Sequence, residues 1–473
     1  MAIDRPDGSS IASLRGQLRS VWDGAHALMR RADDLYWREY DVWPTPALNQ
    51  RRPSYRPSTP ANIVDHASDA QVAYEPRFHR DLPGDGTQQQ SDADFIEKWM
   101  SDVFSEAARH EMFNPFKQAG RHMLQYGYTA MIGPVLDYSD QPKEPKQRSG
   151  ESEEEFAERR SAFRIAENNW FPIRMKAVHP GSVLMHPQEK TPNLAIVKDK
   201  KFVVDLERLT TSKKRLKGTL QWRRDIGMKD YDVVAVEEFW TPEWHSLLLG
   251  DSSDVLYTER NLLGYVPLVH GFSGFGMGRM SDYGSDPSYL AVGLLRHVDQ
   301  SIVAEAQAKT ASLNMHQSAG WPMRGAPDEQ SASEYARRVA TDEMLVGQRE
   351  QFWVENVGQM SQWMFEAQRD VERDIIAGTY RDAISGGREP GVTTVGQQAI
   401  LTNAAERKFI GTQEQLEHMA SVVASRCLML ADRMGGMAVR RRRLRPSQIH
   451  RDYGIRARFE LIDPIIQLQR REM

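Results

Sequence analysis

The segment closest to a catalytic motif is His110-Glu111-Met112-Phe113-Asn114. It begins like the helical zinc-protease motif, in which two histidines one turn apart bind the metal and a glutamate acts as general base. Asn114 stands where the second histidine is needed, so the metal-binding face is incomplete. We therefore expect no zinc site here.

A Gly-rich stretch is the second candidate, because such loops can cradle phosphates. No Gly-Lys-Ser/Thr follows it to bind a phosphate and Mg²⁺, and no β-α-β pattern surrounds it. We expect a flexible connector. Its glycines, which follow Leu268-Val269-His270, are Gly271, Gly274, Gly276 and Gly278.

The other metal-binding and nucleophilic residue types are scattered. None of the 13 histidines is paired with another at the i, i+4 spacing that places two ligands on one helical face. The single cysteine, Cys427, excludes internal disulfides and multi-cysteine zinc sites, and its place in an apolar helical stripe predicts burial. We expect no catalytic residue, no metal, no cofactor and no enzymatic activity.

One dense basic run stands out, Arg440-Arg441-Arg442-Arg443 followed by Arg445. Two uses remain open for it, a phosphate-binding patch and a solvated or intersubunit charged segment. The whole chain has 61 basic and 65 acidic residues and a net charge of −4. This balance of charges argues against a protein that binds DNA tightly through a broad basic surface.

The elements that would position these residues change character along the chain. A helical stripe comprises Leu14, Leu18, Val21, Trp22, Ala25, Leu28 and Met29. We then expect an extended connector over 46–60, and mostly helix over 95–131 despite Pro115, with Gly127 turning the chain towards a strand. The charged stretch 139–160 predicts a solvated insertion, partly helical or disordered.

Strand periodicity follows between 171 and 269. The clearest runs are 233–240, 247–249 and 255–257, with turn-forming residues between them. We expect an antiparallel meander beside helices. Strands gathered before residue 270 and long helices after it favour the α+β class.

Three helical stripes and a loop occupy 289–434. The loop is Ser385-Gly386-Gly387-Arg388-Glu389-Pro390-Gly391. The first stripe is Leu290, Leu294, Val298 and Ile302; the second is Met364, Ala367, Val371 and Ile375; the third is Leu416, Met419, Val423, Cys427, Leu430 and Met434. Helices with apolar stripes and no obvious cover in their own chain favour a ring of subunits, although packing inside a monomer is the alternative.

Three short segments resemble one family, the portal proteins of tailed bacteriophages. They are 60–65 (Pro-Ala-Asn-Ile-Val-Asp), 124–130 (Leu-Gln-Tyr-Gly-Tyr-Thr-Ala) and 261–269 (Asn-Leu-Leu-Gly-Tyr-Val-Pro-Leu-Val). The last, with its Asn-x-x-Gly-x-x-Pro pattern, is the most specific. The order of elements after it is also similar to the order in that family.

The resemblance implies a portal-like subunit with an α/β wing, a two-helix stem, a clip, a tunnel loop and a long C-terminal helix. The corresponding ranges are 1–285 for the wing, 286–313 for stem helix 1, 314–357 for the clip, 358–384 for stem helix 2, 385–391 for the tunnel loop, 392–434 for the long helix and 435–473 for the C-terminal segment.

The same resemblance implies a function as the capsid-vertex channel for packaging and ejection of viral DNA. Its expected partners are other copies in a homo-oligomeric ring of twelve subunits, double-stranded DNA, terminase, capsid protein and a tail adaptor. Its expected location is the virion, and the host cytoplasm during assembly. The channel-lining candidates would be Gly386, Gly387, Arg388, Glu389 and Gly391.

Two other functions remain open. One is a different virion structural or head-tail adaptor protein without a DNA channel, and the other is a hydrolase whose site is assembled from scattered Asp, Glu and His residues. No apolar run approaches the roughly 20 residues that span a bilayer, and the N-terminus lacks the pattern of a signal peptide. We therefore expect no membrane partner and no secretion.

Overall fold

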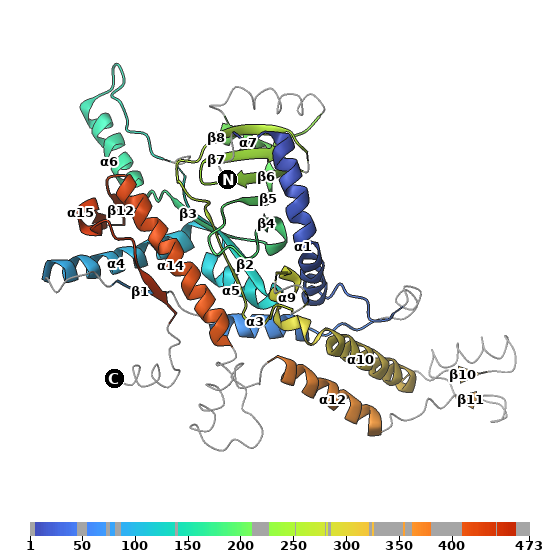
Figure 1. The fold of residues 1–473 in the computed structure, drawn as a ribbon. Helices are drawn as coiled ribbons and strands as arrows, with labels where there is room; N and C mark the ends of the chain where they lie inside the picture. The colour runs from blue at the N-terminus through green and yellow to red at the C-terminus, as the bar shows by residue number, and fades with distance from the viewer. Residues whose placement is uncertain are drawn as a thin grey trace. The chain divides into compact units, whose positions relative to one another are not determined.

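The computed structural model describes residues 5–44, 54–71, 76–80, 87–137, 141–210, 227–250, 252–279, 281, 285–320, 324–325, 353–354, 362–379, 409–440 and 442–459. The chain divides into two compact units. The first comprises Met1–Ala32, Val64–Arg296 and Asp382–Met473, and the second comprises Asp33–Ile63 and His297–Arg381. Helices and antiparallel sheets both contribute, which agrees with an α+β class (Figure 1).

Two antiparallel sheets carry most of the first unit. The five-stranded sheet has the order β4-β5-β6-β7-β8, so it is the meander that the alternating sequence predicts. The three-stranded sheet has the order β3-β2-β9. Their strands are β2 (Tyr128–Leu136), β3 (Ile173–Val178), β4 (Val183–Met185), β5 (Ala195–Phe202), β6 (Val233–Trp240), β7 (Trp244–Leu249), β8 (Val255–Arg260) and β9 (Leu268–Phe272).

Two helices cover the five-stranded sheet. In α1 (Gly8–Tyr36), Trp22 is completely buried and its indole Nε1 donates to the carbonyl of Met185 at 2.8 Å. The helix predicted there is confirmed, but Val21 is 44% exposed and so lies outside the buried stripe. The second helix is α7 (Val203–Thr210), whose Val203 and Leu206 pack against apolar residues of β6, β7 and β8.

The predicted passage from helix to strand is confirmed, with one difference. Pro115 does not lie in the interior of one long helix. Helix α4 (Thr87–His110) ends before it, and it is the first residue of α5 (Pro115–Tyr126). Gly127 ends α5 with φ = +76°, in the left-handed region that favours glycine, and β2 begins at the next residue. A Cβ at Gly127 would lie 2.1 Å from the amide nitrogen of Val292.

The long helix α14 (Ile410–Arg433) passes through the main core of the first unit. Its predicted apolar stripe is confirmed by buried residues at 416, 419, 423, 427 and 430, whereas Met434 lies just after the helix and is 37% exposed. Cys427 is completely buried, and burial raises the pKa of its thiol. Residues 392–408 of the expected helix lie outside the described residues.

Short elements complete the first unit. Strand β1 (Arg77–His79) pairs with β14 (Arg456–Arg458), and β12 (Met437–Val439) pairs with β13 (Arg442–Leu444). The charged insertion contains α6 (Glu153–Asn169), whose side chains are largely exposed. A capping box between Ser152 and Glu155 begins that helix, so the partly helical, solvated insertion expected here is confirmed.

The prediction of one continuous helix over 286–313 is wrong. The chain instead forms α9 (Pro287–Leu290), a 3-10 turn η3 (Leu294–Arg296) and then α10 (Asp299–Gly320). Gly293 approaches the backbone of α5 so closely that a Cβ there would lie 2.1 Å from the carbonyl oxygen of Gln125. Of the apolar residues predicted to share one helical face, Leu294, Val298 and Ile302 are buried and Leu290 is half-buried. The close backbone approach at Gly293 lies where the continuous helix was expected.

The second unit contains two antiparallel helices, α10 and α12 (Gln362–Gly378) (Figure 1). They contact each other near Gly378, where a Cβ would lie 2.4 Å from a methyl group of Val298. Between them, β10 (Arg324–Gly325) pairs antiparallel with β11 (Trp353–Val354). Helix α10 extends to Gly320, into the range expected for an irregular clip, and α12 is described within the expected 358–384.

Polar contacts join α10 to the first residue of α3 (Thr59–Gln71) and to the segment before it. Glu305 is 3% exposed and accepts hydrogen bonds from Thr59 Oγ1 at 2.9 Å and from Lys309 Nζ at 2.5 Å. The amide of Tyr55 donates to Thr310 Oγ1 at 3.0 Å. Of the extended connector expected over 46–60, residues 46–53 lie outside the described residues, and Thr59 and Pro60 belong instead to α3.

Candidate functional site

The residues predicted to do chemistry divide between described and undescribed parts of the chain. The channel candidates Gly386, Gly387, Arg388, Glu389 and Gly391 lie outside the described residues, as does Arg441. The rest of the basic run lies among the described residues. Its members are Arg440, Arg442, Arg443 and Arg445.

A tight hairpin of β12 and β13 carries these arginines. It follows α14 directly through Gly435 and Gly436, whose φ angles of +70° and +108° suit glycine. A Cβ at Gly436 would lie 2.7 Å from the carbonyl oxygen of Leu444. Alternation along the strands buries Met437, Val439 and Leu444 in the core, and this anchors the hairpin on one side.

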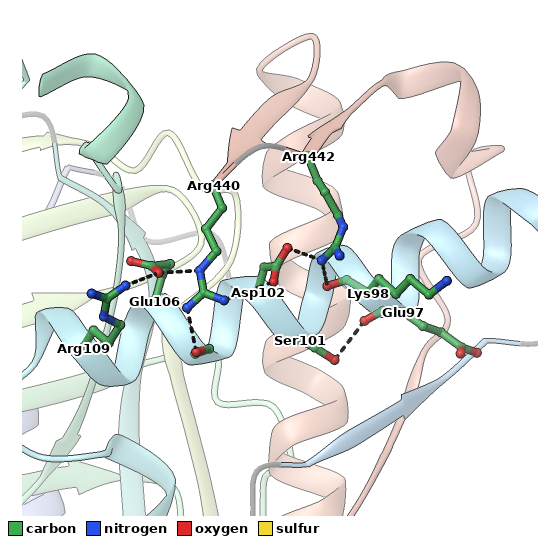
Figure 2. Close-up of polar contacts among 9 residues, drawn as sticks. Glu97, Lys98, Ser101, Asp102, Glu106, Arg109, Arg440 and Arg442 are labelled. Atoms are coloured by element: carbon green, nitrogen blue, oxygen red, sulfur yellow. Dashed lines mark hydrogen bonds and ion pairs between the residues drawn. The ribbon is translucent and has the colours of Figure 1, made fainter. Parts of the chain in front are cut away.

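Two arginines of the hairpin bind acidic side chains of α4 (Figure 2). Arg440 Nε donates to Glu106 Oε1 at 2.6 Å, and its Nη1 donates to Asp102 Oδ1 at 3.3 Å. Arg442 Nη1 donates to the other oxygen of Asp102 and to the carbonyl of Lys98. Asp102 and Glu106 are 13% and 12% exposed, so α4 presents two largely buried carboxylates to two guanidinium groups.

These contacts change the proton affinities of the paired groups. Burial alone would raise the pKa of Glu106, but hydrogen bonds and positive charge from Arg440 and Arg109 outweigh it, so the pKa lies below the ordinary 4.5. The hydrogen bond from Arg440 to Glu106 raises the pKa of that arginine. Both partners are therefore charged at neutral pH, and part of the basic run is neutralised within the chain.

The remaining arginines of the hairpin are placed differently. Arg443 is exposed, and within the described part of the chain no ion pair involves it. Arg445 is also exposed and precedes α15 (Pro446–Ile449), where its amide donates to Gln448. The basic run thus separates into two paired arginines and two solvent-facing ones.

A cavity of about 1190 Å³ opens beside the paired arginines. Its lining comes from the last two turns of α4, the end of α6, the residues before β3, and the hairpin. The lining residues are Asp102, Glu106, Arg109, His110, Ile165, Trp170, Phe171, Ala438, Arg440, Arg442 and Arg443.

The segment 110–114, which begins like a zinc-protease motif, lies at the junction of two helices. Helix α4 ends at His110, so Glu111 is not on the same helix. Asn114 caps α5 by accepting hydrogen bonds from the amides of Phe116 and Lys117. Burial, and then the charge of Arg174, lower the pKa of His110. Among the described residues, no group of three His, Cys, Asp or Glu side chains is placed to bind a metal.

The Gly-rich stretch begins in β9 and continues as a segment without helix or strand. Close packing explains one of its glycines, because a Cβ at Gly276 would lie 2.4 Å from the carbonyl oxygens of Tyr289 and Leu290. Ser273 Oγ donates to the carbonyl of Val292 at 2.7 Å. The stretch is therefore a connector, and it contacts both backbone and side chains of the same chain.

The segment that carries the Asn-x-x-Gly-x-x-Pro pattern is a structured turn. The Asn261 amide group donates to the carbonyls of Thr241 at 2.7 Å and Tyr265 at 2.8 Å, and Gly264 has φ = +68°. Arg426 of α14 donates to Leu268 at 3.1 Å and lies over the ring of Tyr265 at 4.7 Å. The pattern thus positions the start of β9 against α14.

Sequence reasoning missed the acidic partners Asp102 and Glu106 and the buried Arg426. The two carboxylates lie one helical turn apart, which is a weak signal because many solvated helices show it. An arginine among the apolar residues of α14 is a stronger signal of a specific contact, because a buried guanidinium needs hydrogen-bond acceptors.

No protein-family model matches the sequence, and no curated protein is significantly similar to it. Within the described ranges, no helix combines the length and apolar character needed to cross a bilayer.

Proposed function

We propose that this chain is the subunit of a portal ring, which forms the channel for viral DNA at a capsid vertex. The observation that carries the proposal is the helical hairpin of the second unit. Helices α10 and α12 run antiparallel, and between them in sequence the described strands β10 and β11 pair with each other. Two stem helices that flank a clip are the arrangement that the resemblance to portal proteins implies.

The exposed apolar side chains of α12 support assembly. Ile375 is buried, but Ala367 is exposed, Val371 is half-buried and Ile376 is 39% exposed. A neighbouring subunit in a ring would cover such residues, since each copy presents the same surface to the next. The net charge of −4 per chain suits a conduit through which DNA slides without tight binding.

The proposed role is structural, without enzymatic activity. Its partners would be viral double-stranded DNA, terminase, capsid protein and a tail adaptor, in the virion and in the host cytoplasm during assembly. The channel contact would come from the loop 385–391.

Rotationally averaged electron micrographs and native mass spectrometry of the purified protein test the proposal. We expect closed rings with a central opening wide enough for a DNA duplex. A monomer at every concentration would refute the proposal. Rings too narrow for a duplex would instead favour the head-tail adaptor function.

A further inference from the structure

The cavity beside the β12–β13 hairpin has two chemically different walls. One wall presents guanidinium groups, including Arg109 with a 70% exposed side chain and Arg442 with a 41% exposed side chain. The other wall is apolar and aromatic, with Ile165, Trp170 and Phe171. A ligand that fits both walls must combine negative charge with an apolar group.

Charge in the lining is unbalanced. Asp102 and Glu106 supply two carboxylates, and both are already bonded to arginines. Four guanidinium groups face them, so two positive charges remain in excess. The arginines that line the cavity are Arg109, Arg440, Arg442 and Arg443.

One side chain of the apolar wall, Ile165, is strongly exposed, whereas Trp170 is half-buried. Ile165 is 61% exposed on a helix whose other side chains are mostly charged or polar. Phe171 is buried and stacks on His110 with ring centroids 5.5 Å apart, so it gives the wall a fixed base. Covering Ile165 with an apolar side chain would remove it from water.

We propose that this cavity binds an acidic peptide segment of a partner protein that carries a bulky apolar side chain. Carboxylates of the segment would bind Arg443 and Arg109, and its apolar side chain would pack on Ile165 and Trp170. The volume of about 1190 Å³ exceeds the roughly 300–1,000 Å³ of small-ligand sites, which suits a short peptide.

The lining favours a peptide over a nucleic-acid backbone. A duplex backbone presents phosphates and sugars and has no apolar group to cover Ile165. This inference does not depend on ring formation, because every lining residue belongs to one chain.

Fluorescence anisotropy with labelled synthetic peptides tests the inference. The first probe is a peptide with a central Phe flanked by Glu residues. Two comparison peptides replace the Phe by Gly or each Glu by Lys. The fourth probe is a duplex oligonucleotide. We expect the Glu-Phe peptide to bind best. Arg443→Glu should weaken its binding about tenfold or more, since it removes one charge-assisted contact and adds repulsion. Ile165→Asp should weaken it by a similar factor.

Two matched variants separate the site from general charge effects. Arg456→Glu makes the same charge change at an exposed arginine of β14, and Ala157→Asp makes the corresponding change at an exposed position of α6; neither residue lines the cavity. Both should bind the peptide as the unmodified protein does. Absence of binding, equal loss in Arg456→Glu, or stronger binding of the oligonucleotide would each overturn the inference, whether or not rings form.

Discussion

Glu106 lies at the centre of the contact between α4 and the β12–β13 hairpin, where it accepts hydrogen bonds from Arg440 and Arg109. Its partner Arg440 is 334 positions away in sequence. The run of arginines is visible in the sequence, but the carboxylates that pair with it are not. The position of the hairpin after α14 determines which carboxylates the arginines contact. The positive charge of the run could therefore be predicted from the sequence, but its partial neutralisation by Asp102 and Glu106 could not.

Replacement of Glu106 by Gln should destabilise the fold in a pH-dependent way. The pKa of Glu106 is lowered in the folded state, so its contribution is complete above the ordinary value of 4.5 and is lost as pH falls through the lowered value. We expect urea denaturation at pH 7 to show a free energy of unfolding about 1–3 kcal/mol lower for the variant. The difference should shrink below pH 4.5.

Asp94→Asn is the matched control for that measurement, because Asp94 is exposed on the same helix. Its effect should stay within about 0.5 kcal/mol. A Glu106→Gln difference that is unchanged between pH 7 and pH 3 would contradict the assigned ionic contact.

At the scale of elements, the junction between α5 and β2 depends on one glycine. Gly127→Ala should be strongly destabilising, because φ = +76° is strained for alanine and its Cβ would lie 2.1 Å from Val292 N. We expect a loss of about 3 kcal/mol or more in the free energy of unfolding. Thermal denaturation followed by circular dichroism measures the change.

Gly16 provides the opposite case. It lies within α1, and nothing is within 4 Å of the position that a Cβ would occupy. Gly16→Ala should therefore stabilise the protein by about 0.5–1 kcal/mol. Equal effects at Gly127 and Gly16 would show that the close backbone approach at Gly127 is not a constraint.

Local patterns predicted elements well where the chain follows its own periodicity. Strands β6, β7 and β8, helix α1 and the turn at Gly127 were all predicted from alternation, helical spacing or glycine. The interruption between α9 and α10 was not, because it depends on the contact of Gly293 with Gln125, more than 160 positions away in sequence. Helical spacing detects which residues are buried but not a backbone contact that breaks the helix.

For the whole molecule, assembly can be tested on α12. Val371→Asp places a charge on a half-buried side chain of the helix, at a cost of roughly several kcal/mol if a neighbouring subunit covers it. We expect native mass spectrometry to show loss of rings, while circular dichroism shows retained helicity. Ala377→Asp, at an exposed position on another side of α12, should leave assembly unchanged. Intact rings in Val371→Asp would place this side chain outside any interface.

The loop 385–391 joins the second stem helix to the long helix in the proposed portal, and its only long side chains are Arg388 and Glu389. Deletion of 386–389 should leave rings intact, because it removes no residue of an apolar stripe. It should impair DNA packaging or retention, since a Gly-rich loop with one guanidinium can contact moving phosphates without holding them. The measurement is the DNA content of particles assembled with the deleted subunit, compared with particles that carry Arg388→Ala. Normal DNA content in the deletion would assign the loop to a simple connection between helices, even if rings form as proposed.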